Sequence, residues 1–126
     1  MIIDFLGLAM ARSIKADAYL KFMSSRLALR ERAGLPLLDP LEERVIEMIA
    51  LASKPGEQLS VTEVITTAEL GSPTTLHGRL KSLRTKGLIT LAYADDVSRR
   101  QLQLTTAGMS YFDALSKCMV SAVKNS

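Results

Sequence analysis

Three helix-start signals lie close together in the middle of the sequence, and they limit the fold more than any other feature. Asp39 is followed by a proline and then a glutamate, a pattern typical of an N-cap and a favourable first turn. Ser60 and Glu63 predict a capping box, and Ser72 again precedes a proline. Gly71 predicts a left-handed end to the second helix. The segment therefore predicts helices joined by a tight turn.

Apolar residues recur at helical spacing behind each start. The third helix, from Ser72 to about Thr85, aligns Leu76, Leu80 and Leu83 on one narrow stripe. The opposite face carries polar or small residues, namely Thr74, Gly78, Lys81 and Thr85. Thr75, His77 and Ser82 flank this face. The glycine in this face costs about 1 kcal/mol relative to alanine, and we expect close approach to another molecule to offset that cost.

The periodicity changes from helical to alternating after Gly87. Residues 89–93 and 101–105 alternate apolar and polar side chains, which predicts two strands of a β-hairpin. The ADDVS segment between them is typical of a turn. The end of the hairpin holds four charged residues, Asp95, Asp96, Arg99 and Arg100. The predicted fold class is therefore mainly α with a small β-hairpin (α+β).

Amphipathic segments flank this region on both sides. Residues 1–33 are the longest helical candidate and end near Gly34 and Pro36, while another helix runs from Thr106 to about Val123. A compact domain of this size has difficulty covering so much apolar surface, which favours a second copy of the chain as partner. Packing of the two terminal helices against each other is the alternative. The expected domains are an N-terminal dimerisation helix with linker (1–36), a winged helix-turn-helix domain (37–106) and a C-terminal helix at the dimer interface (107–126).

The composition excludes several classes of protein. A chain of 126 residues, 48% hydrophobic and 23% charged, is typical of one soluble globular domain. Cys118 and His77 are the only cysteine and histidine, so neither an intrachain disulfide nor a usual structural zinc site is expected. The apolar start MIIDFLGLAMA lacks a basic region and contains Asp4, which favours a buried helix start over an export signal or membrane span. We expect a cytoplasmic protein without metal or cofactor.

Charge is unevenly distributed along the chain. Residues 39–71 contain two basic and seven acidic residues, whereas residues 72–101 contain six basic and two acidic ones. The basic block coincides with the third helix and the hairpin. A local positive field favours a polyanionic partner, although solvated basic faces are common.

The order of these elements resembles that of bacterial winged helix-turn-helix regulators of the MarR-like type. The resemblance rests on Leu70 and Ser72 at the turn, on TTLHGRLKSLRTKGLI as recognition helix and first wing strand, and on RRQLQLTTAG as the returning strand. The segment Leu104–Gly108 is similar to the family's LT-x-x-G close, which PadR-like regulators share. The family's Asp-x-Arg wing signature is present only as DDVSRR, and Gly78 stands where many relatives have a long side chain.

This resemblance implies a dimeric, sequence-specific DNA-binding transcription regulator that binds a palindromic operator in double-stranded DNA. The recognition helix would enter the major groove and the basic wing would lie at the minor groove. The DNA-binding residues that follow are Ser72, Thr74, Thr75, His77, Gly78, Arg79, Lys81, Ser82, Arg99 and Arg100. Arg79 could instead form a structural ion pair, and the hairpin charges could be a solvated loop end. Relatives often bind a small aromatic effector between the dimer arms and the DNA-binding domains, but no residue here identifies such a site.

Two other functions compete with this interpretation. A winged-helix module that binds an acidic protein partner without DNA would also need a basic face. An enzyme would need His77 as a base or Cys118 as a nucleophile, each with a positioned partner in a pocket. The sequence instead places His77 at the edge of an exposed helix face and Cys118 near the apolar side of a terminal helix. No catalytic residue is expected.

Overall fold

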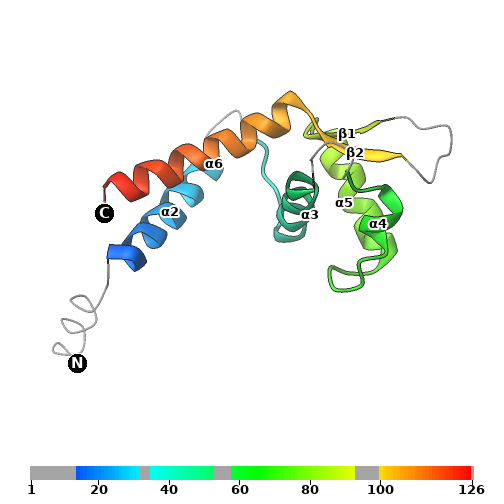
Figure 1. Ribbon diagram of the computed structural model, residues 1–126, viewed down its shortest axis with the longest axis horizontal. Helices are drawn as coiled ribbons and strands as arrows, with labels where there is room; N and C mark the ends of the chain where they lie inside the picture. Colours follow the sequence, from blue (N-terminus) through cyan, green and yellow to red (C-terminus); the bar gives the residue numbers. More distant parts are fainter. Residues whose placement is uncertain (1–13, 32–34, 53–57, 93–99, 126) are drawn as a thin grey trace. The chain divides into compact units, whose positions relative to one another are not determined.

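The fold is given by a computed structural model that describes residues 14–31, 35–52, 58–92 and 100–125 (Figure 1). In chain order the elements are α2 (Ile14–Arg30), α3 (Pro40–Leu51), α4 (Val61–Ile65), α5 (Pro73–Thr85), β1 (Ile89–Ala92), β2 (Gln101–Leu104) and α6 (Thr106–Lys124). The protein is mostly helical with one small antiparallel hairpin, which confirms the predicted α+β class. None of the described helices is long and apolar enough to cross a membrane.

The chain forms two compact units. The head unit is Pro36–Tyr111 and contains α3, α4, α5, the hairpin and the first residues of α6. The terminal unit combines residues 1–35 with residues 112–126, so its described helices are α2 and the rest of α6.

The predicted N-caps open three helices of the head unit. The Asp39 carboxylate accepts a 2.7 Å hydrogen bond from the Glu42 N–H, and the Glu42 carboxylate accepts one of 3.0 Å from the Asp39 N–H. Ser60 and Glu63 exchange the same pair of bonds at 3.1 Å each. Ser72 caps α5 through a 3.3 Å bond from the backbone N–H three residues later. The capping signals in the sequence are therefore confirmed.

Helix α4 is shorter than the sequence predicts. It ends at Ile65, whereas the prediction extended it to Leu70. The hydroxyls of Thr66 and Thr67 donate to backbone carbonyls four residues earlier, at 2.7 and 2.8 Å, and such side-chain bonds compete with the helical backbone ladder. Gly71 does adopt a positive φ of 155°, but it lies well beyond the end of α4. The prediction that Gly71 caps α4 is therefore wrong, and this glycine turns the chain into α5.

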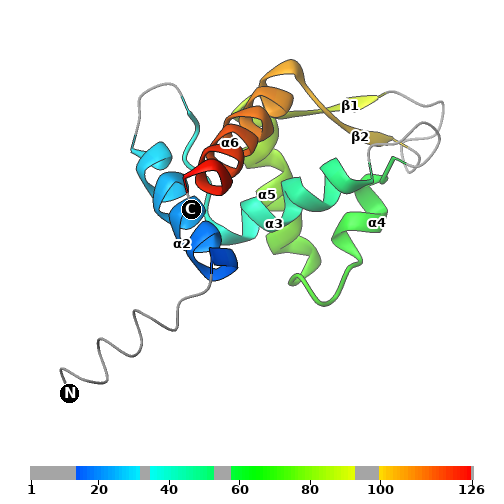
Figure 2. The same cartoon turned by 60° about the vertical axis from the view of Figure 1, so that its left-hand side comes forward.

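The core of the head unit lies between α3, α5 and the hairpin (Figure 2). Leu76, Leu80 and Leu83 of α5 are 0, 4 and 0% exposed, which confirms the predicted stripe. Burial of one such leucine contributes about 1.5–3 kcal/mol relative to leaving it exposed. The largest fully buried side chains are Val45, Ile46, Ile49, Val64, Leu76, Leu83, Leu88 and Leu102. This core fixes which face of α5 remains at the surface.

The hairpin has a further pairing partner that the sequence does not reveal. Strands β1 and β2 are antiparallel, as the alternation predicts. The segment before α4 lies along the other edge of β2, where Ser60 and Gln101 form an isolated bridge. There the Leu102 N–H donates to the Leu59 carbonyl at 2.8 Å. The predicted turn with Asp95 and Asp96 lies outside the described residues.

The end of α5 has the hydrogen-bond pattern of a Schellman motif. The Gly87 N–H donates to the Arg84 carbonyl at 2.9 Å, and the Leu88 N–H donates to the Leu83 carbonyl at 3.1 Å. Gly87 has a φ of 76°, which favours glycine at this position. The motif stops the helix and directs the chain into β1.

The structure explains why threonine and glycine occur in the LT-x-x-G motif at the start of α6. Thr105 accepts a 3.0 Å hydrogen bond from the Gly108 N–H and donates from its hydroxyl to the Gly87 carbonyl. A Cβ on Gly108 would lie 2.3 Å from the Leu88 carbonyl oxygen, so any larger residue would push the two segments apart. The motif therefore joins α6 to the end of α5.

Helices α2 and α6 lie side by side in the terminal unit (Figures 1 and 2). Helix α2 ends at Arg30, before the predicted end at Gly34 and Pro36, and residues 1–13 lie outside the described chain. Lys21 pairs with Asp17 at 3.1 Å and donates to the carbonyl of Asn125. Large apolar side chains remain exposed on both helices, at Tyr19, Leu20, Leu27, Met119, Val120 and Val123.

Candidate nucleic-acid interface

Helix α5 presents a polar surface opposite its leucine stripe. Thr74, Thr75, His77, Gly78 and Lys81 are all exposed, as the sequence predicts. The helix begins with a proline after the Ser72 cap, and the Ser72 hydroxyl also donates to the Thr75 hydroxyl at 2.9 Å. The backbone N–H groups and the helix dipole at such an N-terminus favour an anion.

Two of the predicted site residues contact α3 instead of lying on this surface. The Arg79 guanidinium pairs with the Asp39 carboxylate at 2.7 Å, which favours the ion-pair alternative over phosphate contact. The Ser82 hydroxyl donates to Glu42 Oε2 at 2.8 Å. Lys86 Nζ donates to both Glu42 oxygens, at 2.9 and 2.7 Å. On the side of α5 that faces α3, the basic side chains are therefore paired with carboxylates.

Glu42 is the centre of this network and is only 4% exposed. Burial by itself raises the pKa of this carboxyl. The hydrogen bonds from the Asp39 N–H, Lys86 and Ser82, with the positive charge of Lys86, outweigh burial and hold the pKa below its ordinary value. Glu42 therefore stays ionised near neutral pH and ties the N-terminus of α3 to α5.

A groove of about 620 Å³ lies between α4, α5 and the hairpin. Its basic residues are His77, Lys81 and Arg84 from α5 and Arg100, which directly precedes β2. Within the described chain, no carboxylate pairs with Lys81 or Arg84, in contrast to Arg79 and Lys86 on the α3 side. The positive charge that remains available to a partner is thus concentrated on the groove side of α5.

Arg84 is the site residue that the sequence analysis missed. It is exposed and lines the groove beside Lys81. The spacing of positions 77, 81 and 84 follows the i, i+4, i+7 rule, so a helical projection of the basic residues alone would have found it. Arg100 lines the same groove, as predicted for the wing, whereas Arg99 lies outside the described residues.

Gly78 occupies an open part of this surface. A Cβ at this position would meet no atom within 4 Å, so packing inside the protein does not require the glycine. It lines the groove between His77 and Lys81. Any requirement for glycine here must therefore come from a bound partner.

The cysteine and histidine of the described chain lie apart from each other. Cys118 is half-buried on α6 in the terminal unit, far along the sequence from the exposed His77. Over the part of the chain that the structure describes, no three His, Cys, Asp or Glu side chains are grouped so as to hold a metal ion. The groove along α5 is therefore the best candidate for a functional site.

Comparison with known proteins reveals similarity at the level of structure. No protein-family profile matches the chain, and no curated protein matches it in sequence. S. aureus MepR bound to ethidium bromide superposes with a TM-score of 0.61 at 18% identity, over 97% of this chain and 78% of that one. The S. aureus MepR–DNA complex gives 0.58 at 17% identity, over 97% and 81% of the two chains.

The YusO protein from Bacillus subtilis is similar to the same extent, with a TM-score of 0.58 at 16% identity over 98% of this chain and 79% of that one. In each case the match spans nearly the whole of this chain. The order of α3, α4, α5 and the hairpin is that of a helix-turn-helix followed by a wing. The chain therefore has the winged helix-turn-helix fold of MarR-like regulators such as MepR.

Proposed function

We propose that this protein is a dimeric DNA-binding transcription regulator that acts in the cytoplasm. One observation carries the proposal: the basic residues on the groove side of α5 have no carboxylate partner among the described residues, whereas those on the α3 side are neutralised. A surface that combines an exposed helix with unneutralised positive charge complements the DNA major groove and its phosphates.

Helix α5 acts as the recognition helix in this proposal. Thr74 and Thr75 in its first turn are exposed and contact phosphates or base edges, helped by the free N–H groups of the helix N-terminus. His77 and Lys81 lie about one and two turns further on, where side chains reach bases in the major groove. Gly78 between them lets the helix backbone approach the DNA closely.

The wing supplies a second contact in this proposal. Arg100 leads into β2 and lines the groove, and Arg99 precedes it in the sequence. Arginine is the side chain most often inserted into a narrow minor groove, where the negative potential is greatest. These two arginines then set the position of the head unit along the duplex.

We further propose that residues 1–36 and 107–126 join two copies of the chain. The exposed apolar side chains of α2 and α6 support this, because a single copy leaves them in contact with water. Two α5 helices related by a two-fold axis would bind half-sites about 34–36 Å apart, which requires a palindromic operator. Dimerisation thus sets the operator geometry, and residues 37–106 carry the DNA contacts.

Binding to duplex DNA over a salt series tests this function. Affinity for random-sequence duplex should fall steeply between about 50 and 200 mM salt, because bound protein releases counterions from the phosphates. Selection of bound fragments from a random DNA pool should then enrich a palindrome. A folded dimer that shows no DNA binding at low salt would contradict the proposal and favour a winged-helix module for an acidic protein partner.

A further inference from the structure

The fold gives no reason for glycine at position 78. Gly71 and Gly87 are the described glycines with a positive φ, so the backbone of Gly78 has a conformation that any residue can adopt. A Cβ at this position would meet no atom within 4 Å, so packing does not require glycine either. Glycine nevertheless weakens a helix interior relative to alanine. A bound partner is what can offset this cost.

Gly78 leaves a notch in the exposed face of α5. Residues three or four positions apart are neighbours on a helix surface, so the exposed side chains of Thr74 and Lys81 border this notch. The threonine methyl group and the methylene stem of the lysine are apolar. Gly78 also lines the groove to which Val61 and Ile65 contribute aliphatic side chains. The notch therefore offers the space of one missing side chain, with apolar groups around it.

The chemistry of the major groove specifies what fits such a notch. Gly78 has no side chain, and as the sixth residue of α5 it uses its backbone N–H inside the helix. It can therefore recognise a partner only by shape and apolar contact. Base edges in the major groove present hydrogen-bond donors and acceptors, and thymine adds an apolar C5-methyl group. This methyl group matches the notch in both size and polarity.

We propose that Gly78 selects thymine in the operator by holding its C5-methyl group in the notch between Thr74 and Lys81. This inference rests on the proposed function, which places α5 in the major groove. A side chain at position 78 would take the space of the methyl group, and cytosine, which lacks the methyl group, would leave the notch empty. Gly78 is thus a specificity-determining residue of the recognition helix.

Replacement of thymine by uracil along the operator tests the proposal. Deoxyuridine pairs with adenine as thymidine does and lacks only the methyl group. The full-length protein first selects its operator from a random DNA pool, and each symmetry-related pair of thymines is then replaced in turn. We expect one pair whose replacement lowers the affinity of the wild-type protein by about fifteenfold, or about fourfold for each methyl group removed.

Gly78→Ala should reverse the preference at this pair, because its Cβ fills the notch. The variant should bind the thymine operator about tenfold more weakly than the wild-type protein does. It should bind the uracil operator at least as tightly as the wild-type protein binds that operator. A change in helix stability alone cannot produce this reversal, because it would affect both operators equally.

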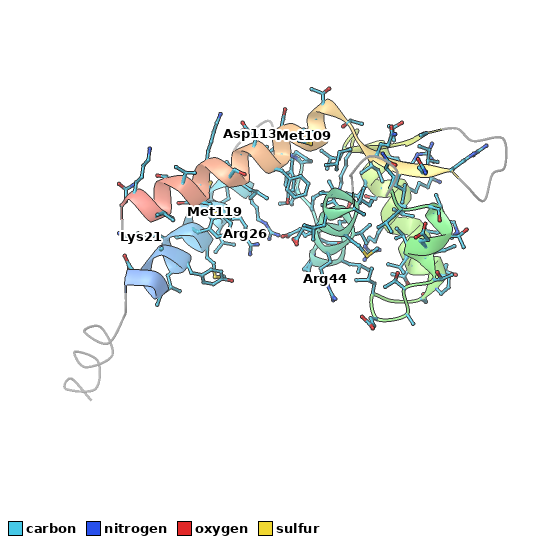
Figure 3. All side chains as sticks on the ribbon, in the orientation of Figure 1. Lys21, Arg26, Arg44, Met109, Asp113 and Met119 are labelled. Atoms are coloured by element: carbon cyan, nitrogen blue, oxygen red, sulfur yellow. The ribbon has the colours of Figure 1, made fainter. Side chains whose placement is uncertain are left out.

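Two charge variants are the matched controls. Lys81→Gln keeps a methylene stem beside the notch, so it should lower the affinity for every operator without changing the response to uracil. Arg44→Gln removes an exposed arginine that projects from α3 (Figure 3) and should change neither the affinity nor the response.

Three results would overturn the inference. One is a uracil scan in which no thymine pair affects affinity, and another is the same uracil response in Gly78→Ala as in the wild-type protein, since another residue would then contact the methyl group. The third is an equal loss of affinity for all operators in Gly78→Ala, because the glycine would then serve only the approach to the DNA backbone. A folded protein that binds no duplex DNA at low salt would instead contradict the proposed function, and the inference with it.

Discussion

Both units expose some large apolar side chains, such as Leu51 of the head unit at 81%, but among the described residues the large, fully buried ones all lie in the head unit. In the head unit the largest core side chains, such as Ile46 and Leu83, are less than 2% exposed. In the terminal unit, large apolar side chains such as Leu27 and Val123 are 54 and 61% exposed. The head unit therefore has a core of its own, whereas the terminal helices carry apolar surface suited to another copy of the chain.

The largest effect should come from truncation in the head-unit core. Leu83→Ala should lower the free energy of unfolding by about 2–5 kcal/mol, because it leaves a cavity at a fully buried site. Urea denaturation measures this, and Leu51→Ala, at an 81% exposed position of the same unit, is the matched control. A loss below about 1 kcal/mol would mean that the head unit is not the stable part of the protein.

Charges on the terminal helices should break the dimer and leave the head unit folded. Leu27→Glu combined with Val120→Glu places carboxylates on the apolar surface that we propose a second copy covers, and should weaken dimerisation by about a hundredfold or more. Sedimentation equilibrium measures the shift, with Leu37→Glu combined with Leu51→Glu, at exposed apolar positions of the head unit, as the control. An unchanged monomer–dimer equilibrium would place the interface elsewhere.

Loss of the charge at Glu42 should weaken the contact between α3 and α5. Glu42→Gln leaves the Lys86 ammonium without its carboxylate and should cost about 1–3 kcal/mol at neutral pH. The pKa of Glu42 is lowered in the folded protein, so its contribution is complete above the ordinary value of 4.5 and is lost as pH falls through the folded pKa.

The difference in stability between wild type and Glu42→Gln should therefore shrink as the solution is acidified below pH 4.5. Thermal denaturation over this pH range measures it, and Glu47→Gln on the exposed side of α3 is the control. A difference that stays constant as pH falls would mean that the charge of Glu42 is not what stabilises the network.

The smallest effect concerns Gly78, and Gly108 provides the contrast. Gly78→Ala should stabilise the protein by about 1 kcal/mol, because the site is helical and open. Gly108→Ala should act in the opposite direction, since its Cβ would meet the Leu88 carbonyl. Thermal denaturation and DNA binding are measured on both. Unchanged DNA affinity in Gly78→Ala would show that the glycine has no role in DNA approach.

Local signals predicted most of the fold. The caps at Asp39, Ser60 and Ser72 and the leucine stripe of α5 depend on neighbours three or four residues away, and all are confirmed. The end of α4 was predicted wrongly because threonine hydroxyls compete with the backbone. The bridge between Ser60 and Gln101 joins residues distant in the sequence, and no local pattern signals it.

The candidate site was harder to predict for the same reason. Glu42 lies about forty residues from Ser82 and Lys86, so the sequence placed Ser82 on the exposed face instead of against α3. Arg79 remained ambiguous until Asp39 was located beside it. Exposure of Thr74, His77 and Lys81 followed correctly from helical periodicity. The sequence therefore identifies the exposed face of α5, whereas pairing with residues distant in the sequence decides which of its basic side chains remain available to a partner.

The central claim is that the groove side of α5 binds DNA, and a salt series on two variants tests it most directly. Lys81→Gln removes a charge from that side, whereas Arg44→Gln removes an exposed charge from α3. We predict that Lys81→Gln weakens DNA binding and reduces the slope of log affinity against log salt by about 0.9, the value for one lost phosphate contact. Arg44→Gln should leave both unchanged. Equal effects of the two substitutions, or no effect of Lys81→Gln, would contradict the account.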